Sequence, residues 1–104
     1  MPASQYVRLL RERIGSSYLL LPGVTAVIRD DDRFLLARQR DSGRWSLIGG
    51  GIEPGEDPRV ALLREVREEL GVGSDVIRII GAYGGAALEN VYPNGDQVGY
   101  VTVA

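Results

Sequence analysis

Apolar residues near the start of the chain recur every three to four positions, which is the spacing of a helix face. They are Tyr6, Leu9, Leu10 and Ile14. Ser4 can cap the N-terminus of such a helix, and Gly15 is a suitable stop. The pattern predicts a helix from Gln5 to Ile14. Its other side carries Arg8, Arg11 and Arg13, which fit either a solvated face or a basic patch for phosphates or a partner.

A second helical pattern follows Asp57, a good N-cap, and Pro58, which suits the first helical position because its missing N–H costs nothing there. Its apolar arc contains Leu62, Leu63, Val66 and Leu70. Gly71 suits the position just after the last turn. We therefore predict an amphipathic helix between Pro58 and Gly71 that packs on a core by one side.

Short apolar or alternating runs predict strands in the remaining chain. They span Val24–Arg29, Arg33–Arg40, Arg44–Ile48, Val76–Tyr83 and Val98–Val103. The acidic triplet 30–32 lacks the spacing and glycine of an EF-hand loop, so a solvated hairpin turn is favoured over a calcium site. Residues 84–96 are irregular with a turn at 92–95, and the last run is predicted to be the second arm of a hairpin.

Three side chains around the predicted strands are open to two interpretations. Trp45, the only tryptophan, fits a packed position in or near the core, and it also fits a ligand-stacking role. Arg38 and Arg40 leave the second strand and fit either a solvated strand end or contacts to an anionic ligand.

Composition restricts the chemistry. The 104 residues suit one small domain spanning 1–104, in which residues 1–21 form the first helix and its lead-in. A net charge of −2 does not favour nucleic-acid binding. The absence of cysteine and histidine excludes thiolate, disulfide and imidazole chemistry and favours carboxylates with a hard metal ion. No apolar run near the N-terminus is long enough for a signal core or a membrane span, so we expect a cytoplasmic enzyme.

The second predicted helix carries Glu65, Glu68 and Glu69 at spacings i, i+3 and i+4. Like charges at these spacings destabilise a helix by a few tenths of a kcal/mol per pair. Taken alone, the cluster fits a solvated acidic face relieved by nearby arginines. A divalent cation would turn this cost into a gain, because Mg²⁺ takes one or two carboxylates together with water and phosphate oxygens.

A glycine run, 49–51, precedes this helix and predicts a turn whose backbone approaches a ligand or metal closely. Its carbonyls can bind a hard metal and its N–H groups can meet phosphate. Gly51 and the nearby Glu53, with Arg38 and Arg40, are candidate substrate-binding residues.

The spacing from Gly50 to Val72 resembles the Nudix box, GX5EX7REUXEEXGU, at every position. The fixed residues are Gly50, Glu56, Arg64, Glu65, Glu68, Glu69 and Gly71. A chance match is of order one in a billion per starting position at average residue frequencies. The chain therefore resembles the Nudix hydrolases, the MutT-related superfamily. In this resemblance residues 49–72 form the box, a loop followed by a helix.

This resemblance implies an α/β fold, an α/β/α sandwich with a mixed sheet. It implies hydrolysis of a nucleoside diphosphate linked to another moiety, an ADP-ribose-like compound or a nucleoside triphosphate. Glu65, Glu68 and Glu69 would hold Mg²⁺ or Mn²⁺ with the carbonyl of Gly50. Arg64 would orient the glutamates through an ion pair with Glu56, and Glu65 could alternatively orient or deprotonate water.

The resemblance also carries departures. Ile48 stands where the family commonly has proline, and the further strands and second helix usual after the box are missing. We therefore expect a C-terminally truncated domain whose exposed apolar sheet surface favours dimerisation. The motif of NADH pyrophosphatases is absent, the proline expected in ADP-ribose pyrophosphatases is not at its place, and the acidic pI disfavours mRNA decapping. A non-catalytic nucleotide sensor and a truncated inactive fragment are the alternatives, although sensors often lose box residues and this box is intact.

Overall fold

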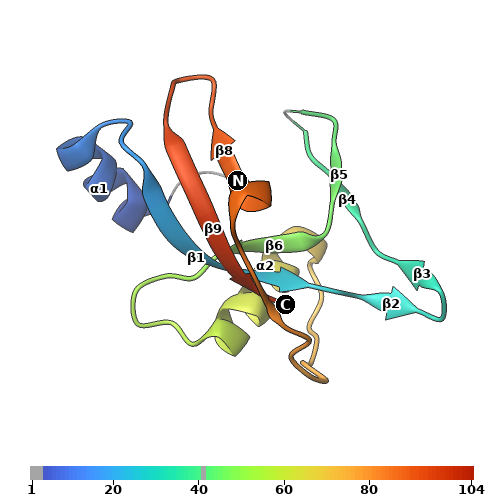
Figure 1. The fold of residues 1–104 in the computed structure, drawn as a ribbon. Coiled ribbons are helices and arrows are strands. Elements are labelled where there is room, and N and C mark those ends of the chain that lie inside the picture. The colour runs from blue at the N-terminus through green and yellow to red at the C-terminus, as the bar shows by residue number, and fades with distance from the viewer. Residues whose placement is uncertain (1–3, 41) are drawn as a thin grey trace.

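The computed structural model describes residues 4–40 and 42–104. In this part of the chain, β1 lies at the centre of a mixed five-stranded sheet, antiparallel to β6 on one side and parallel to β9 on the other (Figure 1). Both β7 and β8 pair antiparallel with β9. The bounds are β1 Leu19–Ala26, β6 Ile48–Gly51, β7 Ala82–Tyr83, β8 Glu89–Val91 and β9 Gln97–Val103. The predicted hairpin at the end of the sequence is confirmed as β8–β9, preceded by the short 3₁₀ helix Ala86–Leu88.

Both predicted helices are confirmed with their ends. Helix α1 (Gln5–Ile14) begins at Ser4, whose Oγ accepts a hydrogen bond from the Val7 N–H at 3.2 Å. Helix α2 (Pro58–Leu70) begins at Asp57, whose carboxylate accepts from the Arg59 N–H at 2.8 Å. Gly71 ends α2 in the left-handed region at φ 72°, a conformation that glycine adopts without steric cost.

Helix α2 packs across β1 and β6 and buries the main apolar cluster of the described residues. Ala26 from β1, Ile48 from β6 and Val66 from α2 form the centre of that cluster, and each is at most 5% exposed. Leu62 and Leu70 extend it from the predicted apolar arc of α2. This mixed sheet with helices confirms the predicted α/β fold class.

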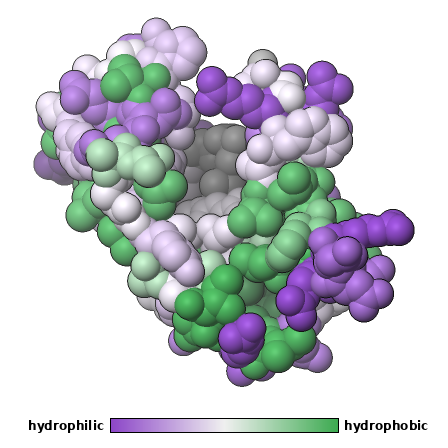
Figure 2. All heavy atoms as spheres, turned by 45° about the vertical axis from the view of Figure 1, so that its right-hand side comes forward, coloured by the Kyte–Doolittle hydropathy of each residue, from purple (hydrophilic) through white to green (hydrophobic). Residues whose placement is uncertain are grey.

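Residues 27–47 depart from the strands predicted there, because Arg33–Arg40 does not form one continuous strand. They form two short ribbons that project from the main sheet (Figure 1). One pairs β2 (Arg29–Asp30) with β3 (Arg33–Phe34), and the other pairs β4 (Ala37–Arg38) with β5 (Trp45–Ser46). Trp45 is 65% exposed, so its predicted packing in or near the core is wrong. Figure 2, with this side turned toward the viewer, shows broad apolar areas at the surface.

The strand predicted for Val76–Tyr83 is wrong over most of its length, because only Ala82–Tyr83 forms one. Ala82 pairs with Val103, and the Ile80 N–H donates to the Ala104 carbonyl at 2.8 Å. Residues 76–79 therefore lie past the last paired residue of β9. Without a neighbouring strand Ile77 and Ile79 stay in solvent, at 96% and 70% exposed, whereas Val76 is partly buried.

Candidate active site

The glycine run is part of strand β6 and not the turn that the sequence predicts. Gly50 pairs with Val24 and Gly51 with Gly23 across the β1–β6 ladder. A Cβ built on Gly50 would overlap the carboxylate of Glu65, which reaches back from α2 onto the strand. Glycine is required at this position because only a bare Cα leaves room for that carboxylate.

Glu65 is a buried acid at the contact between α2 and β6. Its side chain is 3% exposed, and its Oε1 accepts a hydrogen bond from Arg64 Nη1 at 2.9 Å. Burial raises the pKa of Glu65, because a carboxylate loses hydration when it leaves water, and the neighbouring guanidinium opposes this rise. Keeping a carboxylate at this buried position therefore lowers the stability of the fold.

Arg64 gathers the acidic groups of the site. Its Nε and Nη2 donate to the two oxygens of Glu56 at 2.8 and 2.9 Å, a two-point contact that matches the fork of the guanidinium. Nη2 also donates to the Gly51 carbonyl at 2.9 Å, and Nη1 lies 3.5 Å from Glu68. The predicted ion pair between Arg64 and Glu56 is present. It lowers the pKa of Glu56, and hydrogen bonding to the same carboxylate raises the pKa of Arg64.

The loop that leads from β6 to α2 is tied to Arg64 through Glu56. Glu56 Oε1 accepts from the Glu53 N–H at 3.1 Å, and the Glu56 N–H donates to the Glu53 carbonyl at 3.0 Å. Gly55 between them has φ 77°, a left-handed conformation that glycine allows. The loop therefore holds Glu56 in place for the arginine.

The residues proposed for a metal ion fit one in chemical type. They offer carboxylate and carbonyl oxygens, the ligands that Mg²⁺ and Mn²⁺ prefer. Glu65 and Gly50 are in direct contact, whereas Glu68 and Glu69 are exposed on the next turn of α2. Neighbouring protein atoms remove part of the hydration of the Glu69 carboxylate, and this loss raises its pKa. Within residues 4–40 and 42–104, no group of three or more acidic side chains converges on one point in this arrangement.

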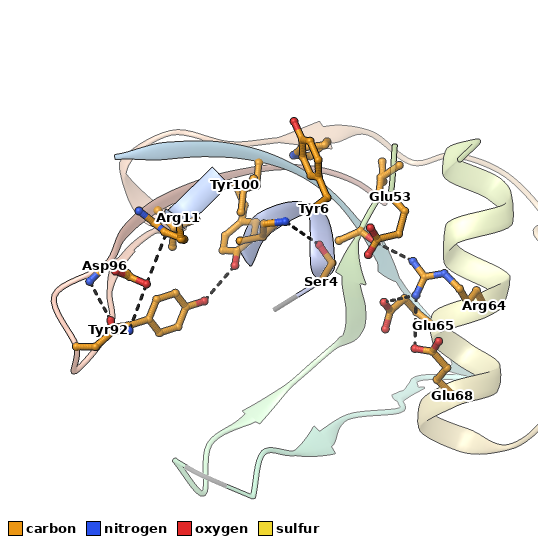
Figure 3. Close-up of a pocket in the computed structure, with 17 residues that line it drawn as sticks. Ser4, Tyr6, Arg11, Glu53, Arg64, Glu65, Glu68, Tyr92, Asp96 and Tyr100 are labelled. Atoms are coloured by element: carbon orange, nitrogen blue, oxygen red, sulfur yellow. Dashed lines mark hydrogen bonds and ion pairs between the residues drawn. The ribbon is translucent and has the colours of Figure 1, made fainter. Parts of the chain in front are cut away.

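A cavity of about 530 Å³ opens beside these groups (Figure 3). Its lining includes Gly51, Glu53, Arg64, Glu65 and Glu68 at one end. Two of the four candidate substrate-binding residues, Gly51 and Glu53, thus face it. The other two, Arg38 and Arg40, lie on the projecting ribbon and do not line this cavity, nor does Trp45.

The other end of the cavity was not predicted from the sequence. It is lined by Arg11 from α1 and by Tyr92, Asp96 and Tyr100 from the β8–β9 hairpin, and Tyr6 of α1 lines the cavity between the two ends (Figure 3). No local spacing could have shown this, because α1 is far in sequence from the hairpin and is brought to it by the parallel pairing of β1 with β9. The periodic arginines of α1 were the one available signal, and they did not distinguish Arg11 from its neighbours.

The described chain has no helix with both the length and the hydrophobicity needed to span a membrane.

The NUDIX domain family model matches residues 19–103. A MutT-like protein of Streptomyces ambofaciens is 42% identical over 57 residues, which are 55% of this chain and 37% of that protein. The nucleoside triphosphatase NudI of Salmonella agona is 49% identical over 53 residues, which are 46% of this chain and 38% of NudI. The matched stretch thus spans less than two fifths of either curated relative.

Solved structures show the same fold. The E. coli ORF135 protein has a TM-score of 0.58 at 31% identity, with 81% of this chain and 59% of that chain covered. A MutT protein from Methanosarcina mazei has a TM-score of 0.61 at 27% identity, with 81% and 61% covered. A UDP-X diphosphatase has a TM-score of 0.63 at 23% identity, with 100% and 52% covered, and this likeness concerns the fold alone.

Proposed function

Because the chain belongs to the NUDIX domain family, we propose that it hydrolyses the pyrophosphate bond of a nucleoside diphosphate linked to another moiety, with Mg²⁺ or Mn²⁺ and water. One observation above all supports this proposal. Arg64 joins Glu56, Glu65 and Glu68, and the Glu65 carboxylate lies directly against Gly50 at the end of a cavity large enough for a small ligand.

In this proposal Glu65, Glu68 and Glu69 hold the metal with the Gly50 carbonyl. A bound divalent ion supplies neutralisation of the phosphate charge and a more acidic water molecule. The chain's own contribution is to keep Glu65 at the strand and to present Glu68 and Glu69 from the next turn. The side chain of Glu68, 57% exposed, has the freedom to turn toward a ligand in the cavity.

Arg64 orients the carboxylates in this proposal. Its guanidinium is fixed by the two oxygens of Glu56 and by the Gly51 carbonyl, so its remaining nitrogen can hold Glu65 in one position. Glu65 has a second assignment open to it. As the most buried carboxylate of the site it can orient or deprotonate water, since a buried acid keeps a higher proton affinity than an exposed one.

The substrate is an ADP-ribose-like compound or a nucleoside triphosphate. The relative named as a nucleoside triphosphatase supports the second class, although the match covers 38% of that protein. We expect the enzyme to act in the cytoplasm without nucleic acid. We also expect the exposed apolar residues of the sheet, such as Leu20 and Val101, to favour a homodimer. A monomer mass in light scattering would contradict the dimer.

The proposal is tested by release of phosphate or pyrophosphate from a panel of nucleoside triphosphates and diphosphate-linked sugars. Hydrolysis should require Mg²⁺, disappear with a chelator and return when Mg²⁺ is restored. Glu68→Gln and Glu69→Gln should each reduce the rate about a hundredfold, the scale expected when a preorganised charge is lost. Glu12→Gln, an exposed change on α1, should leave it unchanged.

Two outcomes would contradict this assignment. Full metal-dependent activity in both α2 variants would remove Glu68 and Glu69 from the site. Nucleotide binding without hydrolysis of any panel member would favour a sensor.

A further inference from the structure

The cavity beside α2 has two chemically different ends. The end at α2 is ionic, since Glu53, Arg64, Glu65 and Glu68 line it. The other end is aromatic, since Tyr92 and Tyr100 line it, and Tyr6 of α1 lines the cavity between the two ends (Figure 3). A single cavity with an ionic end and an aromatic end matches a ligand that joins phosphates to a flat ring.

Among the described residues that line it, the aromatic end presents no unpaired charge to a ligand. Arg11 donates to the carbonyls of Gly15, Ser17 and Gln97 at 3.0, 2.6 and 2.8 Å, and its Nε lies 3.5 Å from Asp96. These contacts use the guanidinium to join α1 to the turn before β9. An anionic group would also meet the Asp96 carboxylate, so this end disfavours a second phosphate or an acidic sugar.

The aromatic end also offers a directed polar contact. The hydroxyls of Tyr92 and Tyr100 are hydrogen-bonded to each other at 3.0 Å (Figure 3). Only one of the two protons is used in that bond, so the second hydroxyl can donate to a ring nitrogen or carbonyl. Burial raises the pKa of Tyr100, so its hydroxyl stays a protonated donor at neutral pH.

We propose that Tyr6, Tyr92 and Tyr100 form the nucleobase subsite of this cavity, so that α1 helps to determine which nucleotide is accepted. This inference rests on the proposed function for the identity of the ligand. Helix α1 ends at Ile14, outside the 19–103 stretch that matches the family model, and it brings Tyr6 to the cavity as a feature of this chain. Aromatic rings bind bases by stacking, and hydroxyls then select among their edges.

Binding of uncharged nucleosides tests the subsite without metal or turnover. Adenosine, guanosine, cytidine and uridine are titrated into the metal-free protein by NMR, with D-ribose as the ligand that lacks a base. At least one nucleoside should bind, and ribose should not. Tyr6→Ala should weaken that nucleoside about tenfold, the scale of one lost stacking contact. Tyr100→Phe keeps the ring and should change the preference among bases.

Tyr83→Ala is the matched control, because Tyr83 is an exposed tyrosine of β7 that does not line the cavity. Circular dichroism establishes whether each variant is folded. If Tyr6→Ala does not fold, Tyr100→Phe carries the test of the subsite. In hydrolysis, Tyr6→Ala should raise KM about tenfold and leave kcat unchanged.

The inference is overturned if no nucleoside binds the wild type, if ribose binds as well as the nucleoside, or if both cavity variants bind like the wild type. An equal loss in Tyr83→Ala also overturns it. Failure of the proposed function is a separate result, because nucleosides would then bind the tyrosines while no nucleotide is hydrolysed.

Discussion

Arg64 and Arg11 lie at opposite ends of the same cavity and are each held at several points, yet their partners differ in kind. Arg64 is bound mainly by carboxylates, those of Glu56, Glu65 and Glu68. Arg11 is bound mainly by main-chain carbonyls, with Asp96 at the longer distance of 3.5 Å. Carboxylates can be protonated and carbonyls cannot. The contribution of Arg64 to stability therefore depends on the ionisation of its partners. The contacts of Arg11 to carbonyls, which join two segments of the chain, do not.

The largest difference between the two arginines should appear when Arg64 is removed. Arg64→Ala leaves the buried Glu65 without its cation, and the free energy of unfolding should fall by about 3 kcal/mol. Arg67→Ala, an exposed change on the same helix, should stay within about 0.5 kcal/mol of wild type. Denaturant unfolding of both variants measures this. Equal losses would mean that Glu65 does not depend on Arg64.

Gly50→Ala disturbs the same charged cluster through a substitution on strand β6. The new Cβ would occupy the place of the Glu65 carboxylate and push it away from Arg64, at a cost of about 2 kcal/mol in unfolding free energy. Gly51→Ala is the control, since its nearest neighbour would be the Pro22 carbonyl at 4.0 Å. Thermal unfolding compares the two, and similar melting temperatures would show that the carboxylate can move aside freely.

Arg11→Ala should cost less, about 1.5 kcal/mol, because the carbonyls it leaves behind can be hydrated. The loss should be the same at pH 3 and pH 7, in contrast to the contact of Arg64 with Glu56, which weakens as pH falls through the lowered pKa of Glu56. Arg8→Ala on the exposed side of α1 is the control and should have little effect. A loss that disappears at high salt would indicate that the ion pair with Asp96, and not the carbonyls, carries the contact.

The smallest effect is the pH dependence of Glu56. Arg64 lowers the pKa of Glu56 below its ordinary 4.5, so this contact stabilises the fold fully above that value and is lost as pH falls through the lowered pKa. Glu65, whose pKa is raised, changes stability in the opposite sense. The difference in unfolding free energy between wild type and Glu56→Gln separates the two. It should be constant from pH 6 to 8 and shrink below about pH 4, and a constant difference throughout would contradict the contact.

Features of the fold and site could be predicted from the sequence when the residues that form them are close together in the chain. The caps of α1 and α2, and the contact of Arg64 with Glu56, depend on residues within two turns or one loop of each other. Their spacing is visible in the sequence itself. Arg11 was not distinguishable from Arg8 or Arg13, because its partner carbonyl at Gln97 is 86 residues away and any residue type supplies a carbonyl.

The wrong predictions have the same origin. The glycine run was predicted to form a turn, but its backbone pairs with β1. Whether a short segment forms a strand depends on a partner elsewhere in the chain, which its own residues do not show. The segment 76–83 has the composition of a strand but lacks a neighbouring strand over most of its length. Trp45 is apolar and yet exposed, because the ribbon that carries it projects from the sheet.

The parallel pairing of β1 with β9 has a consequence for biosynthesis. Thr25 and Thr102 share a hydroxyl hydrogen bond at 2.7 Å across these strands, although they are 77 residues apart. During translation β1 leaves the ribosome before β9, so the edge of β1 that faces β9 stays without a partner until residues 97–103 have emerged. Closing so large a loop also slows folding. Nascent chains of this protein should therefore depend on chaperones that shield a single unpaired strand.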